Sequence, residues 1–288
     1  MSLLACDTEQ TISIEQEIKE TPAPFQNDEP EKMESVAMLK QKNVGEEKAP
    51  KLEKNPVNAI KTSSEEEVDS TYNFHDYEDY NAFLQKFVYP SGKVKYADIK
   101  ANKATMNEIV KEFESNTPQS DWSRNEKLAY WINVYNLYTI KLVVDNYPTS
   151  SIKNIAGGKP WDKKFIPIGG KTYSLNNVEN DIIRPRFKEP RIHFAVNCAS
   201  KSCPVLLNKA YKPSKLSAQL TYQTKRFLKD TSKNQFSGNT AKLSKIFSWY
   251  KEDFTRNGTV IDFINKYRSE KLNNPKISYL EYSWSLNK

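Results

Sequence analysis

The spacing of apolar residues predicts three helices in the first half of the folded region. Hydrophobic side chains recur every three or four positions over residues 79–88, over 104–115 and, most strongly, over 123–146. The third helix begins with a capping box, in which Ser123 accepts a hydrogen bond from a first-turn amide and Glu126 returns one. Its broad apolar face suits this helix to burial.

Short elements of both kinds follow along the chain. Gly169 and Gly170 separate two short runs and predict a hairpin. Because no regular alternation of strand and helix appears, the expected class is α+β: one mixed domain with a central antiparallel or mixed sheet flanked by helices. The expected strands are residues 164–168, 171–174, 191–197, 241–246 and 276–284, and the further helices are 175–187, 213–230, 247–254 and 260–267.

Composition separates the first 70 residues from the rest of the chain. Residues 1–70 hold 16 acidic and 8 basic side chains, and Phe25 is their only aromatic residue. Such a segment buries too little apolar surface to offset its chain entropy. We therefore expect a disordered acidic linker over residues 1–70 and one globular domain over residues 71–288.

The start of the chain indicates a lipid anchor. Leu3-Leu4-Ala5-Cys6 has the form of a bacterial lipobox, in which the cysteine is lipidated. A long spacer behind it suits a membrane tether, so the expected location is the bacterial cell envelope, in the periplasm or at the outer membrane. A cytoplasmic protein with a chance tetrapeptide is the alternative. Contact with the membrane is expected only through this lipid, since no segment has the roughly 20 apolar residues of a membrane span.

Residues 71–288 hold 35 basic and 20 acidic side chains, which raises the question of a nucleic-acid partner. The lysines are interspersed with acidic residues, as in residues 251–253, and no nucleic-acid motif is present. We therefore expect a solvated basic surface and no nucleic-acid partner. Attraction to an anionic envelope polymer remains open.

The segment RIHFAVNCASKSCP, residues 191–204, concentrates reactive side chains. Cys198 follows a predicted strand and lies near a histidine and a lysine, which favours its nucleophilic thiolate form. We expect Cys198 to act as nucleophile, His193 as base and Glu179 as the residue that orients the imidazole. On a straight strand, Cys198 and His193 would lie about 16 Å apart on opposite faces. They meet only if the chain bends at residues 197–200.

Other interpretations of the same residues remain open. Cys203 is close enough in sequence for a disulfide with Cys198, which would make the pair structural or redox-active. Two cysteines and one histidine fall short of the four ligands of a zinc site, so no metal or other cofactor is expected. Asn133 and Asn136 share one side of the long helix. They are expected either to pin a neighbouring loop or to line the site.

Four motifs can be compared with a known family: EKLAYWINVYN (residues 126–136), SLNNVENDIIR (174–184), RIHFAVNCASKSCP (191–204) and YSWSLN (282–287). Through these motifs, residues 74–288 resemble the family catalogued as domain of unknown function 547, found in bacteria and plants. The resemblance brings no established reaction with it, and the alternative fold class that it implies is papain-like or transglutaminase-like. It implies a pocket that contains Cys198, His193 and Glu179, and we expect the residues that bind substrate there to be Trp131, Asn133, Asn136, Ser200 and Arg184.

The chain departs from the family pattern at two positions. Asn180 replaces a histidine and Ser283 replaces an aspartate, so this member is inactive if the missing histidine is the family's base. Cys203 is a less constant position. The expected function is a cysteine-dependent hydrolase or acyl or amide transferase that acts on a small molecule, peptide or polymer. The alternatives are a non-catalytic module that binds an anionic envelope polymer or a partner protein, and a thiol redox protein that uses Cys198 and Cys203.

Overall fold

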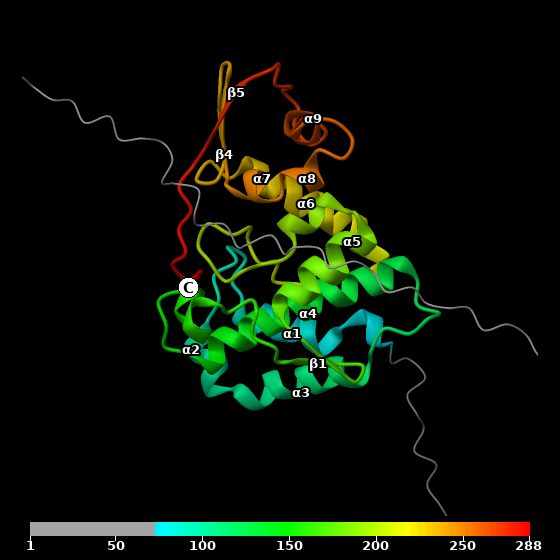
Figure 1. Cartoon of the computed structure of the whole chain (residues 1–288). Coiled ribbons are helices and arrows are strands. Elements are labelled where there is room, and N and C mark those ends of the chain that lie inside the picture. Colours follow the sequence, from blue (N-terminus) through cyan, green and yellow to red (C-terminus); the bar gives the residue numbers. More distant parts are fainter. Residues whose placement is uncertain (1–72) are drawn as a thin grey trace, which may run out of the picture. The chain divides into compact units, whose positions relative to one another are not determined.

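A computed structural model describes residues 73–288 of the chain (Figure 1). These residues fall within one compact unit, Thr71–Lys288. The expected linker over residues 1–70 and the expected lipidation at Cys6 lie outside the described residues. No helix within residues 73–288 combines the length and the apolar character that crossing a bilayer requires.

Helix α4, Arg124–Asp145, occupies the centre of the larger hydrophobic core. The predicted capping box is present, because Ser123 Oγ accepts from the Glu126 amide at 3.2 Å and Glu126 Oε2 accepts from the Ser123 amide at 2.6 Å. Nearly all side chains from Leu128 to Val144 are buried, so α4 has no solvent face along most of its length. The helices that precede it are α1, Glu78–Phe87, α2, Tyr96–Ala101, and α3, Lys103–Ser115.

The β structure is divided between two small sheets. Strands β1, Ile166–Ile168, and β2, Lys171–Tyr173, form the predicted hairpin, with Ile166 opposite Tyr173. In the other sheet β4 pairs antiparallel with β3 and parallel with β5. The α+β class is therefore confirmed, but a buried helix fills the centre where we expected a sheet. The strands of the second sheet are β3, Gln235–Ser237, β4, Thr240–Leu243, and β5, Lys276–Tyr279.

The remaining helices are short, apart from α6. The predicted helix over residues 175–187 is a π-helix followed by one α-helical turn, and the predicted helix over residues 247–254 is divided between α7 and α8. The bounds are Asn177–Ile183 for the π-helix, Arg184–Phe187 for α5, Leu216–Lys229 for α6, Ile246–Trp249 for α7, Lys251–Phe254 for α8 and Val260–Asn265 for α9. Single 3-10 turns cover Phe74–Asp76, Ile152–Asn154, Ala156–Gly158 and Pro213–Lys215.

The predicted strand over residues 191–197 is wrong. Residues Pro190–Phe194 form a 3-10 helix, in which proline occupies the first turn and the Glu189 carboxylate accepts from the Arg191 amide at 3.2 Å. Proline presets the backbone angle of a first helical turn. The residues from Ile192 to Val196 are all buried, so the burial does not alternate. Periodicity cannot separate a strand from a helical turn in such a short apolar run.

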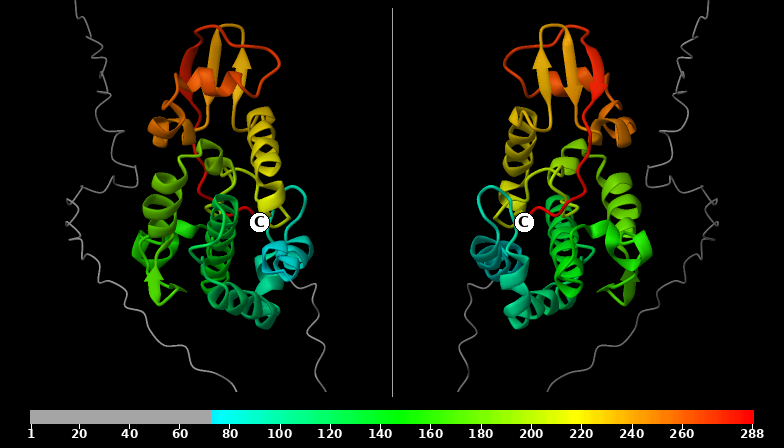
Figure 2. Two further views of the ribbon diagram at one scale, coloured as in Figure 1. Left: turned by 90° about the vertical axis from the view of Figure 1, so that its right-hand side faces the viewer. Right: turned by 90° about the vertical axis from the view of Figure 1, so that its left-hand side faces the viewer.

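This 3-10 helix lies between two hydrophobic clusters. Ile192 and Val196 belong to the core around α4, whereas Phe194 belongs to a second cluster built from α6 to α9. Figure 2 shows the three-stranded sheet at one end of the domain and α3 at the other. After β5 the chain returns toward α2, where the Tyr96 hydroxyl donates to Asn287 Oδ1 at 2.7 Å.

Candidate functional site

The two cysteines of residues 191–204 lie in contact. Cys198 Sγ and Cys203 Sγ are 2.9 Å apart, and both thiols are free. A disulfide bond measures about 2.05 Å, so a small movement would join the two sulfurs. Cys198 is half-buried and Cys203 is buried, so Cys198 is the more exposed of the two residues.

The chain bends sharply through residues 197–204, which we call the cysteine loop. The Asn197 side chain accepts from the Ala199 amide at 2.8 Å and donates to the Pro204 carbonyl at 2.7 Å. Ala199 has a φ of 61°, in the left-handed region that residues other than glycine seldom adopt. The Cys203 amide then donates to the Ser200 carbonyl at 3.1 Å and closes the turn. The chain does bend at residues 197–200, and the bend brings the two thiols together.

Two asparagines of α4 pin the backbone on either side of this region. Asn136 donates to the Ala195 carbonyl at 3.0 Å and accepts from the Asn197 amide at 2.8 Å. Asn133 makes the same pair of bonds with the carbonyl and amide of Tyr211, both at 2.9 Å. Both side chains are almost fully buried. Each amide is thus engaged at both ends with main chain, as expected of a network that pins a loop.

Residues 282–287, which we call the terminal segment, run along the cysteine loop. The Lys201 amide donates to the Ser285 carbonyl at 2.7 Å, and the Asn287 amide donates to the Ala199 carbonyl at 3.1 Å. Ser283 is held through its main chain, since its amide donates to Ser202 Oγ at 2.8 Å. The YSWSLN motif therefore supports the backbone on which the thiols are mounted.

Hydroxyl groups surround the Cys198 sulfur. Ser200 Oγ lies 3.2 Å and the Tyr282 hydroxyl 3.3 Å from Cys198 Sγ, and Ser200 also donates to Tyr282 at 2.9 Å. Burial raises the pKa of Cys198, but hydrogen bonds with Cys203, Ser200 and Tyr282 outweigh it and bring the pKa down to about 7. Burial and the neighbouring Cys198 sulfur raise the pKa of Cys203. The two thiols therefore differ in both acidity and access.

His193 belongs to a different group of side chains. Its Nε2 is 2.8 Å from Asp253 Oδ2, and its ring stacks on Tyr250 with the centroids 3.9 Å apart. Burial lowers the pKa of His193, so the neutral ring donates from Nε2 to the Asp253 carboxylate. Nδ1 is buried and has no hydrogen-bond partner among the described residues. Asp253 is therefore the residue that orients the imidazole, a role that we expected of Glu179.

Glu179 and Arg184 lie beside this histidine. Glu179 is 4% exposed, and its Oε1 has no hydrogen-bond partner within residues 73–288. Burial raises the pKa of Tyr250, and the nearby Glu179 carboxylate raises it further. Arg184 donates from Nε to Asp253 at 2.6 Å and from its guanidinium to Asn180 at 2.8 Å. Asn180 therefore accepts a hydrogen bond from Arg184.

The expected catalytic residues are divided between these two groups. Cys198 contacts Cys203, Ser200 and Tyr282, and no hydrogen bond within residues 73–288 joins Cys198 to His193. Trp131, an expected substrate-binding residue, is 6% exposed and packs edge-on against neighbouring aromatic rings. The sequence reasoning missed one side chain in each of these two groups. Tyr282 is part of the YSWSLN motif and could have been included, whereas Asp253 lies in none of the four motifs.

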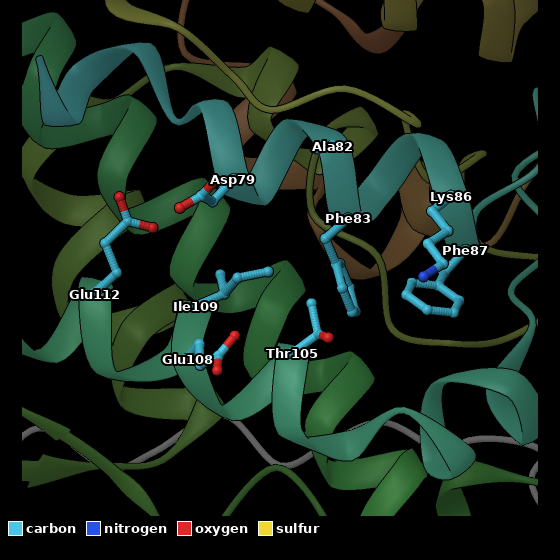
Figure 3. A pocket seen from close by; sticks show the side chains of 9 residues that line it. All are labelled: Asp79, Ala82, Phe83, Lys86, Phe87, Thr105, Glu108, Ile109 and Glu112. Carbon is cyan, nitrogen blue, oxygen red and sulfur yellow. The ribbon is translucent and has the colours of Figure 1, made fainter. Parts of the chain in front are cut away.

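A cavity of about 370 Å³ lies elsewhere, between α1 and α3. Phe83 and Ile109 face its interior, and the carboxylates of Asp79, Glu108 and Glu112 surround one part of it (Figure 3). None of the expected site residues lines it. Among residues 73–288 no group of three or more His, Cys, Asp or Glu side chains has an arrangement that could hold a metal ion.

Residues 119–228 match the model of a known protein family, which is described as "Protein of unknown function, DUF547". The search of curated proteins and the search of solved structures found no match. The matched range includes α4, the π-helix and the cysteine loop, and it ends before Asp253 and the terminal segment. Over residues 119–228 the chain therefore resembles the DUF547 family, as its motifs led us to expect.

Proposed function

We propose that this protein carries out thiol–disulfide exchange through Cys198 and Cys203. The observation that carries the proposal is the distance of 2.9 Å between their sulfur atoms. Two thiols held this close form a disulfide without large backbone movement, because the loop has already brought the ends together.

The difference between the two thiols supports a division of roles. The attacking thiol of an exchange reaction reacts fastest when its pKa is near the ambient pH. Cys198 has a pKa of about 7, and it is also the more exposed of the two cysteines, so it suits the role of the attacking thiol. Cys203 is buried with a raised pKa, which suits a second thiol that reacts only within the molecule.

The reaction proceeds in two steps. The Cys198 thiolate attacks one sulfur of a substrate disulfide, which forms a mixed disulfide and releases the first substrate sulfur as a thiolate. Cys203 then loses its proton and attacks Cys198 Sγ, which forms the Cys198–Cys203 disulfide and releases the second substrate thiolate. Both substrate thiolates take up protons, so the substrate disulfide is reduced to two thiols as the protein dithiol is oxidised.

The hydrolase hypothesis has less support. A cysteine hydrolase needs a base in contact with its nucleophile, whereas the hydrogen-bond partners of Cys198 Sγ within residues 73–288 are Cys203, Ser200 and Tyr282. The lipid anchor at Cys6 and the location in a bacterial envelope stay predictions. An oxidising envelope compartment would suit a redox role, because protein disulfides persist there.

The test is the equilibrium of the dithiol in a Cys6→Ser background, which leaves two thiols in the chain. The protein is incubated with reduced and oxidised glutathione at varied ratios, alkylated, and digested for mass spectrometry. We expect a reversible Cys198–Cys203 disulfide. Cys203→Ser should accumulate glutathione on Cys198, and Cys198→Ser should accumulate little. Absence of the internal disulfide at every ratio, or equal glutathionylation of both variants, would refute the proposal.

A further inference from the structure

Four half-buried aromatic side chains form a continuous surface, which we call the aromatic patch. Tyr282 contacts two tryptophans with ring centroids 4.7 Å apart in each case, and the remaining ring contacts measure 5.5 and 5.7 Å. The rings come from three separate parts of the chain, so the fold gathers them. The members of the aromatic patch are Trp161, Trp249, Tyr282 and Trp284.

The aromatic patch is continuous with the reactive thiol. The hydroxyl of Tyr282 lies 3.3 Å from Cys198 Sγ, while its ring contacts Trp249 and Trp284. A molecule that lies against these rings therefore has part of its length within reach of Cys198. Half-buried tryptophan and tyrosine are the residues that contribute most to binding energy at protein interfaces, because each buries a large rigid surface.

Two lysines lie close to the aromatic patch or the cysteine loop. The Lys153 ammonium lies 5.4 Å above the Trp284 ring, and Lys201 is an exposed residue of the cysteine loop. Neither lysine forms an ion pair within residues 73–288, so both charges are available to an incoming anionic group. Residues 71–288 hold 35 basic and 20 acidic side chains, and this excess of positive charge attracts an anionic substrate over a longer range.

We propose that the aromatic patch binds the segment of a protein substrate that flanks its disulfide, and that this segment carries an aromatic or aliphatic side chain and acidic residues. The inference rests on the proposed thiol–disulfide exchange. A peptide fits the position better than a sugar does, because the neighbouring group is a thiol and polypeptides carry disulfides. The apolar side chain would pack on Trp249 and Trp284, and the carboxylates would pair with Lys153 and Lys201.

The test compares two substrates of the full-length protein. One is a peptide disulfide with acidic residues and a phenylalanine beside the bond, and the other is hydroxyethyl disulfide. We expect Trp249→Ala to lower the ratio of their kcat/KM values at least about tenfold, mostly through KM for the peptide. Tyr222→Ala, which removes an aromatic side chain that is 57% exposed on α6, is the matched control and should keep the ratio.

Lys153→Glu provides a second variant that leaves the rings in place. It should weaken exchange with the acidic peptide and strengthen exchange with a peptide of the same length in which lysines replace the acidic residues. Equal kcat/KM values for peptide and small disulfide in the unmodified protein, or an unchanged ratio in both variants, would overturn the inference. Quenching of tryptophan fluorescence by an oligosaccharide but not by the peptide would do the same. If the protein reduces neither disulfide, the proposed function itself fails.

Discussion

Truncation of Asn136 tests how the cysteine loop is held. Its amide makes two buried hydrogen bonds, to the Ala195 carbonyl at 3.0 Å and from the Asn197 amide at 2.8 Å. Asn136→Ala leaves both main-chain groups without a partner, at about 1–3 kcal/mol each, so the free energy of unfolding should fall by about 2–6 kcal/mol. A domain in the upper part of the usual range of about 5–15 kcal/mol remains folded after this loss, and the urea titration shows directly whether the variant is folded.

The same change should slow the chemistry of Cys198. If the loosened loop no longer holds Cys203 against Cys198, the pKa of Cys198 returns from about 7 toward its ordinary value of 9.0. The thiolate fraction at pH 7 then falls about fiftyfold, while the greater nucleophilicity of the more basic thiolate recovers about eightfold. Alkylation by iodoacetamide at pH 7 should therefore be about sixfold slower, and the pH of half-maximal rate should rise.

Asn133→Ala is the matched control. Asn133 is equally buried on α4 and makes the same two bonds with main chain, but it holds Tyr211 rather than the cysteine loop. Urea unfolding should show a similar loss of stability in both variants, whereas the alkylation rate should change only in Asn136→Ala. If both variants slow alkylation equally, or neither does, Asn136 does not act through the thiols and the reasoning is refuted.

Three further changes test the site and the fold. Tyr282→Phe removes a hydroxyl that stabilises the Cys198 thiolate, so the midpoint of the alkylation profile against pH should shift above about 7; an unchanged midpoint would exclude this contact. The pKa of Asp253 is depressed in the folded state despite its burial, because His193 and a neighbouring arginine bond to the carboxylate. The ionised carboxylate therefore stabilises the folded state above the unfolded pKa of about 3.9, and this contribution is lost as the pH falls through the folded pKa. Asp253→Asn should therefore lower the free energy of unfolding by about 3 kcal/mol at pH 7, with the difference from the unmodified protein shrinking below pH about 4 in urea titrations; a constant difference would contradict the linkage. Ser123→Ala should cost about 1 kcal/mol, measured by thermal unfolding, because it removes one half of the capping box of α4.

Local signals in the sequence were sufficient for much of the helical part of the fold. The capping box of Ser123 and Glu126 marked the start of α4, and the glycine pair marked the hairpin of β1 and β2. These signals succeeded because a cap or a tight turn depends on residues within a few positions of each other. The spacing of Asn133 and Asn136 likewise indicated a shared side of α4, and both side chains contact main chain that pins nearby segments.

The composition of the site depended on contacts that no local pattern contains. Asp253 lies 60 positions from His193, and Tyr282 lies 84 positions from Cys198, so only the folded chain brings these pairs together. The strand expected over residues 191–197 failed for a related reason. Its apolar residues are buried between two clusters rather than against one face, and a run of five buried residues has no period to separate strand from helix. The order of residues along the chain thus placed the two thiols within one short segment, whereas the side chains that they contact depend on the path of the whole chain and follow only from the fold.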